Sequence, residues 1–89
     1  MLEKRIVIKN RLGLHARAAV KFVNLANRYS ADVRIIKDDT AIDGKSILGI
    51  LTLAATQGTP IVLRITGKDE DDAFKALAAL INEKFGEKE

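Results

Sequence analysis

The 89-residue sequence contains no cysteine and no tryptophan, and it has a single histidine. Without cysteine, neither a disulfide framework nor a thiolate metal site can form, and this fits a reducing compartment. No apolar run approaches the roughly 18–20 residues that a membrane-spanning helix needs. The first residues lack the basic, apolar and small-residue order of a signal peptide. We therefore expect a cytoplasmic protein without membrane insertion.

Aromatic residues are also scarce, at 4% of the chain. Proteins that bind single-stranded nucleic acid usually stack the bases on aromatic side chains. The formal net charge is +3, and the lysines and arginines are scattered along the chain rather than clustered. A phosphate group or a partner with an acidic surface therefore fits the composition better than nucleic acid does.

Hydrophobic residues make up 47% of the chain, enough for a core, and their spacing alternates between two periods. A period of two predicts strands over residues 5–9, 32–37, 40–42 and 61–66. A helical period predicts helices over residues 16–29 and 47–53, and a third that Asp69 caps and Gly86 ends. The order βαββαβα predicts one domain over residues 1–89, an α+β open-faced sandwich with four strands on one side and helices on the other.

The most informative segment is Gly13–Ala19, where a histidine stands at the expected start of the first helix. His15 occupies the N-cap position, for which Ser, Thr, Asp and Asn are the usual residues. A helix N-terminus has unpaired N–H groups and partial positive charge, so it suits an anion. A neutral imidazole can attack phosphorus, and the guanidinium of Arg17 can bind phosphate oxygens. His15 is thus a candidate phosphoryl acceptor, and an ordinary solvated or structural histidine is an equally open interpretation.

Two other chemistries fit this segment less well. A metal site is not expected, because the chain offers neither a second histidine nor a cysteine as ligand. Acid–base catalysis has no evident partner for His15, because residues 13–19 include no carboxylate.

The second informative segment is Gly44–Leu51. Its Gly44-Lys45-Ser46 resembles the end of a phosphate-binding P-loop, but the upstream glycine spacing is missing, so we reject a nucleotide site and expect no cofactor. Ser46 is a good N-cap for the short helix that follows. This helix carries more apolar surface than one face can bury. The excess is either a contact surface for other proteins or is covered by loops, and the sequence leaves both open.

Two motifs together resemble one known family. Gly13-Leu14-His15-Ala16-Arg17 is similar to the active-site signature of HPr, the histidine-containing phosphocarrier family of the bacterial phosphoenolpyruvate-dependent sugar phosphotransferase system. Lys45-Ser46-Ile47-Leu48-Gly49 is similar to the regulatory serine segment of that family, and the resemblance covers essentially the whole chain. It implies an HPr-like sandwich of four antiparallel strands with three helices on one face.

The resemblance also implies a stoichiometric phosphoryl carrier rather than an enzyme. His15 would accept a phosphoryl group on Nδ1 from phosphorylated enzyme I and pass it to the A component of a sugar permease, while Arg17 would steady the phosphate. Ser46 would be the serine that HPr kinase/phosphorylase modifies, and a transcription regulator would bind the modified form. The carrier would be a monomer. Its partner-binding residues would be Leu14, Ala16, Ile47, Leu48 and Leu51.

The sequence departs from the family pattern at Ala18, where a proline is usual. Alanine keeps the helix and restores one N–H donor that proline lacks, so we expect little loss of carrier chemistry. The departure leaves open a nitrogen-related or purely regulatory branch of the family. Two further classes are an acylphosphatase, which would release phosphate, and an interaction module, whose partner binding would survive His15→Ala.

Overall fold

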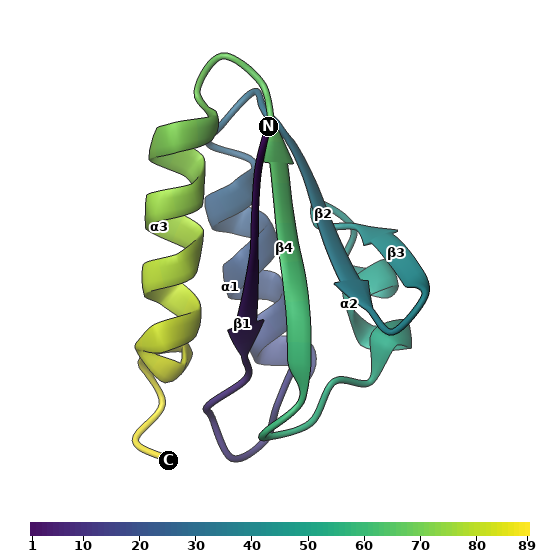
Figure 1. Cartoon of the computed structure of the whole chain (residues 1–89). Coiled ribbons are helices and arrows are strands. Elements are labelled where there is room, and N and C mark those ends of the chain that lie inside the picture. The colour runs from purple at the N-terminus through teal and green to yellow at the C-terminus, as the bar shows by residue number, and fades with distance from the viewer.

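The computed structural model describes residues 1–89 and contains the predicted succession of strands and helices. The four strands form one antiparallel sheet in the order β1-β4-β2-β3, and the helices cover one of its faces (Figure 1). This confirms the open-faced sandwich. The strands are β1 (Leu2–Val7), β2 (Asp32–Lys37), β3 (Thr40–Asp43) and β4 (Pro60–Thr66). The helices are α1 (Ala16–Ala26), α2 (Ile47–Leu53) and α3 (Glu70–Asn82), followed by a 3-10 turn (Lys84–Gly86).

The core lies between the sheet and the helices. Successive residues of a strand face opposite sides, and in the central strand β4 the alternate residues Ile61, Leu63 and Ile65 are buried as predicted. From the helices, Phe22 and Leu77 are fully buried against them. None of the helices has both the length and the apolar character needed to cross a membrane.

Several element ends differ by a few residues from the sequence prediction, and α3 ends at Asn82 instead of continuing to Gly86. The first strand ends at Val7 instead of residue 9, yet Ile8 remains buried and bonds across to Thr59 and Gly58 outside the ladder. Helix α1 ends at Ala26 instead of residue 29. Its last turn tightens, because the N–H of Tyr29 donates to Ala26 O, three residues back, at 3.1 Å.

The third helix begins where the sequence predicts, but Asp69 does not cap it with its side chain. The Asp69 carboxylate instead accepts hydrogen bonds from the N–H groups of Ser30 (2.8 Å) and Ala31 (2.9 Å). These bonds connect the start of α3 to the turn between α1 and β2. The hydrogen bond from the Ser30 N–H is the main reason why the pKa of Asp69 lies below its ordinary value.

Candidate functional site

His15 is the N-cap residue of α1, as predicted, with an extended backbone (φ −76°, ψ 177°). Its carbonyl accepts the first helical hydrogen bond, from the Ala19 N–H at 2.9 Å, but its imidazole caps nothing. The N–H groups of Ala16, Arg17 and Ala18 consequently have no acceptor within the protein. Three unpaired donors at a helix N-terminus form a preorganised site for an anion next to the imidazole.

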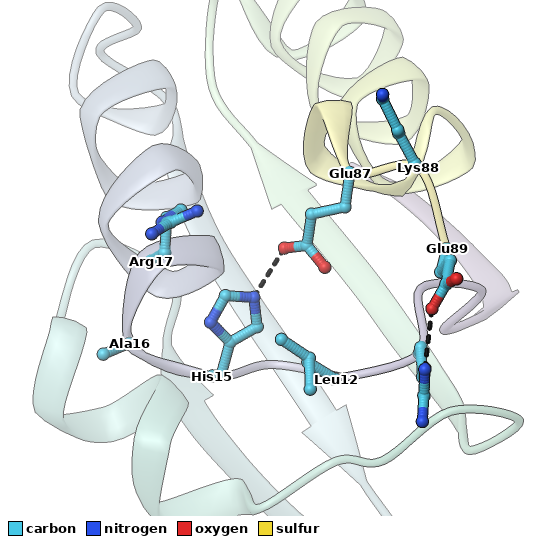
Figure 2. A pocket seen from close by; sticks show the side chains of 8 residues that line it. Leu12, His15, Ala16, Arg17, Glu87, Lys88 and Glu89 are labelled. Atoms are coloured by element: carbon cyan, nitrogen blue, oxygen red, sulfur yellow. Dashed lines mark hydrogen bonds and ion pairs between the residues drawn. The ribbon is translucent and has the colours of Figure 1, made fainter.

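The imidazole is paired with a carboxylate from the opposite end of the chain. Figure 2 shows the side chain of Glu87 reaching His15, whose Nε2 lies 2.5 Å from Glu87 Oε2. A carboxylate can only accept here, so Nε2 carries the proton, and in the neutral ring Nδ1 keeps the lone pair. Figure 2 places this second nitrogen on the side of the ring away from Glu87, toward the first turn of α1.

Glu87 is itself held by a second hydrogen bond. Its Oε1 accepts from Asn10 Nδ2 at 3.1 Å, and Asn10 is fully buried in the loop before α1. Burial of Glu87 disfavours its ionised form, but the hydrogen bonds from His15 and Asn10 outweigh this effect and lower the pKa of Glu87 below its ordinary value. The carboxylate is therefore ionised at neutral pH.

The loop before His15 depends on a glycine in the left-handed backbone region. Gly13 has φ +68°, and a Cβ at this position would lie 2.4 Å from the backbone oxygen of Ala55. Its own carbonyl accepts from Asn10 Nδ2 at 2.8 Å. The residue at position 13 must therefore be small, because the backbone after α2 lies directly against it.

The imidazole opens onto a surface depression that is lined by both basic and acidic side chains. Arg17 is exposed and makes no hydrogen bond or ion pair, so its guanidinium is available for an anion bound at His15. Arg11 is occupied by Glu89, with 2.8 Å between Arg11 Nη1 and Glu89 Oε2. The residues that line the depression are Arg11, Leu12, His15, Ala16, Arg17, Glu87, Lys88 and Glu89 (Figure 2).

An apolar surface lies on α2. Ile47, Leu48 and Leu51, which we call the α2 patch, are 39%, 72% and 37% exposed, so loops do not cover the excess apolar surface of this helix. Ser46 precedes the patch and caps the helix as predicted, accepting from the Gly49 N–H at 3.0 Å.

Two residues predicted to bind partners differ in exposure. Ala16 is exposed beside His15. Leu14 is only 5% exposed and packs in the core, so its side chain cannot belong to a contact surface, contrary to the sequence prediction. The two neighbours of His15 in the sequence thus differ, because Leu14 is buried in the core and Ala16 lies at the surface.

Sequence reasoning missed Glu87 and Asn10. The segment around His15 contains no carboxylate, but the fold brings one from 72 positions away in the sequence. Asn10 is fully buried, and nothing in its sequence neighbourhood indicates this.

No group of three or more His, Cys, Asp or Glu side chains is arranged to hold a metal ion.

Comparisons with known proteins agree with this geometry. The family model described as "PTS HPr component phosphorylation site" matches residues 2–83. The phosphocarrier protein HPr of Neisseria meningitidis serogroup B is 48% identical over the full length of both chains. A crystal structure of HPr from Thermoanaerobacter tengcongensis superposes with a TM-score of 0.96 at 45% identity, covering all of both chains. Crh of Bacillus subtilis, described as a swapped dimer, gives a TM-score of 0.77 at 38% identity over 94% of this chain and 97% of Crh.

Proposed function

The chain belongs to the HPr family of phosphocarriers of the phosphotransferase system, and from this premise we propose that His15 carries a phosphoryl group from phosphorylated enzyme I to the A component of a sugar permease. The observation that carries the proposal is the position of His15. Its imidazole stands at a helix N-terminus with three unpaired N–H groups, with Nδ1 directed away from Glu87.

In the proposed reaction, the Nδ1 lone pair of His15 attacks the phosphorus atom held by the donor. The bond between phosphorus and the donor atom breaks, and its electron pair returns to the donor. The N–H groups of the first turn and the guanidinium of Arg17 offset the charge of the phosphoryl oxygens. A helix terminus at the surface stabilises an anion by less than about 2 kcal/mol, so the group stays transferable. Attack by the acceptor then regenerates His15, which makes the protein a stoichiometric carrier.

We propose that the α2 patch docks the partners and that Ser46 controls this docking. Phosphorylation of Ser46 by HPr kinase/phosphorylase would add a charge of about −2 next to the patch. The start of α2 accommodates that charge without a change of fold, because its N–H groups favour an anion. Acidic partners would be repelled, whereas a transcription regulator with a basic surface would be attracted.

We propose that the carrier acts as a cytoplasmic monomer. Sedimentation equilibrium at micromolar concentration should give the mass of one chain, and a dimer mass would contradict this part of the proposal.

Incubation with radiolabelled phosphoenolpyruvate and a catalytic amount of enzyme I tests the central claim. We expect one phosphoryl group per chain, labile in acid and stable in alkali, and none on His15→Ala. Arg17→Ala should be labelled on the same residue but more slowly. Equal labelling of His15→Ala would overturn the proposal, and release of free phosphate from acyl phosphates would favour an acylphosphatase instead.

The acceptor distinguishes the branches of the family. The labelled carrier should pass its group to the A component of a sugar permease. Ala18 is the one residue that favours the alternative, a nitrogen-related or regulatory phosphorelay. Transfer only to a nitrogen-related acceptor would replace the sugar pathway and leave the role of His15 intact.

A further inference from the structure

The segment after α3 follows an unusual backbone path. Lys84, Phe85 and Gly86 have φ values of +59°, +56° and +78° in succession. Left-handed backbone is unfavourable for residues with a Cβ, so it persists only where the surroundings enforce it. Here Phe85 is buried in the core, and its carbonyl accepts from Lys21 Nζ at 2.6 Å.

Beyond this turn, Glu87 and Glu89 lie against the loop that precedes α1. Glu87 then joins two points of that loop, with one carboxylate oxygen on Asn10 and the other on His15. Glu89 fixes the end of the segment, because its backbone oxygen accepts from the Arg11 N–H at 2.8 Å. Both the strained turn and the two anchored ends serve to place one carboxylate on the imidazole.

We propose that Glu87 is a positioning residue for phosphoryl transfer: its carboxylate holds the Nε2 proton of His15, orients Nδ1 toward the phosphoryl donor and stabilises the charge that develops on the ring. The proposal rests on the proposed function of His15. The low pKa of Glu87 agrees with it, because only the ionised carboxylate offers this stabilisation.

The charge balance of the step shows what Glu87 contributes. When the Nδ1 lone pair forms its bond to phosphorus and the donor leaves with the old bonding pair, the ring still carries its Nε2 proton and becomes cationic. The carboxylate of Glu87 accepts a stronger hydrogen bond from that cation than from the neutral ring, so the stabilisation grows along the reaction. In the onward step the ring leaves phosphorus as a neutral imidazole with Nε2 still protonated, and the proton stays on the same atom.

Glu87→Gln and Glu87→Ala test the proposal, with Glu83→Gln as the matched control. Glu83 carries the same charge four residues earlier, but its side chain is exposed, pairs with no other residue and lies outside the depression around His15. We expect the rate of labelling by enzyme I to fall about tenfold in both Glu87 variants, since a charge-assisted hydrogen bond is lost at a partly exposed site. Glu83→Gln should change the rate less than about twofold. Added formate should restore part of the rate of Glu87→Ala, because it can occupy the vacated carboxylate position.

A spectroscopic measurement separates positioning from a general effect on the fold. Nitrogen-15 NMR of the wild-type imidazole should show a slowly exchanging, strongly deshielded Nε2 proton, which disappears in Glu87→Ala while the thermal unfolding transition remains cooperative. Wild-type labelling rates in both Glu87 variants, or an unchanged Nε2 proton signal in Glu87→Ala, would overturn the proposal. A wild-type chain that takes no label on His15 would instead refute the proposed function on which it rests.

Discussion

Substitutions at Ser46 can change two properties separately, namely the stability of α2 and the charge beside the α2 patch. Ser46→Ala removes the hydrogen bond from the Gly49 N–H to Ser46 Oγ, which is 3.0 Å long. Loss of an N-cap side chain typically costs about 1 kcal/mol. The seven-residue α2 is too short to be stable by itself. For a chain of this size, a loss of about 1 kcal/mol lowers the melting temperature by about 4–8 °C.

Ser46→Asp should have the opposite pair of effects. Aspartate caps a helix about as well as serine, and its charge is favourable at the helix N-terminus. We therefore expect the free energy of unfolding to stay within about 0.5 kcal/mol of wild type. The new charge lies next to Ile47 and should weaken binding to enzyme I about tenfold by repelling an acidic partner.

Two assays on wild type, Ser46→Ala and Ser46→Asp separate the effect on stability from the effect on docking. Urea unfolding followed by circular dichroism measures the stability of α2 within the fold, and calorimetric titration with enzyme I measures docking. If Ser46→Ala weakens docking as much as Ser46→Asp, then fraying of α2 and not charge controls the interaction, and our reasoning about Ser46 is refuted. If Ser46→Ala unfolds at the same urea concentration as wild type, the cap contributes nothing.

Three further predictions concern other parts of the structure. Gly13→Ala should lower the free energy of unfolding by more than about 2 kcal/mol, since its Cβ would overlap the backbone of the neighbouring loop; Gly58→Ala, at φ +86° with open space around it, should cost only about 1 kcal/mol, and equal losses in urea unfolding would contradict this. Because the pKa of Asp69 is lowered in the folded protein, the stabilisation by Asp69 is complete above its ordinary pKa and is lost as pH falls through the folded pKa. Asp69→Asn should therefore reduce the loss of stability in acid, and an unchanged dependence of stability on pH would refute this role of Asp69. Leu48→Glu should leave thermal unfolding unchanged, because the side chain is 72% exposed, but should weaken binding to enzyme I about tenfold; unchanged affinity would remove Leu48 from the docking surface.

The elements of the fold could be predicted from the sequence because their signals are local. The alternation in Ile61, Leu63 and Ile65 and the capping serine before α2 depend only on neighbouring residues. The early end of α1 and the true partners of Asp69 could not be predicted, because they depend on the turn between α1 and β2 packing against the start of α3. The antiparallel arrangement of the strands was implied by the family resemblance and not by periodicity, and the strand order was not predicted.

The same difference between local and long-range signals applies to the candidate site. His15 and its helix start are contiguous in the sequence, so a helix N-terminus with a nucleophile could be inferred before the structure was known. Its carboxylate partner depends on the left-handed turn at Lys84 and Phe85, which no sequence rule predicts for residues with a Cβ. Long-range partners of this kind have no local pattern, and only the three-dimensional arrangement identifies them.

Ala18 adds to the unpaired N–H groups on one side of His15, and Glu87 lies on the other side. Its N–H is one of the three unpaired donors near His15, and a proline at this position would leave only two. The extra donor favours the phosphoryl group once it is bound, whereas Glu87 stabilises the cationic ring during transfer and adds a negative charge close to the bound phosphoryl group. In the phosphorylated state the charge of Glu87 thus stabilises the cationic ring but repels the phosphoryl oxygens, which the unpaired donors attract. A carrier must hold its group without trapping it, so an additional donor on one side of the imidazole and a carboxylate on the other are physically consistent with reversible transfer.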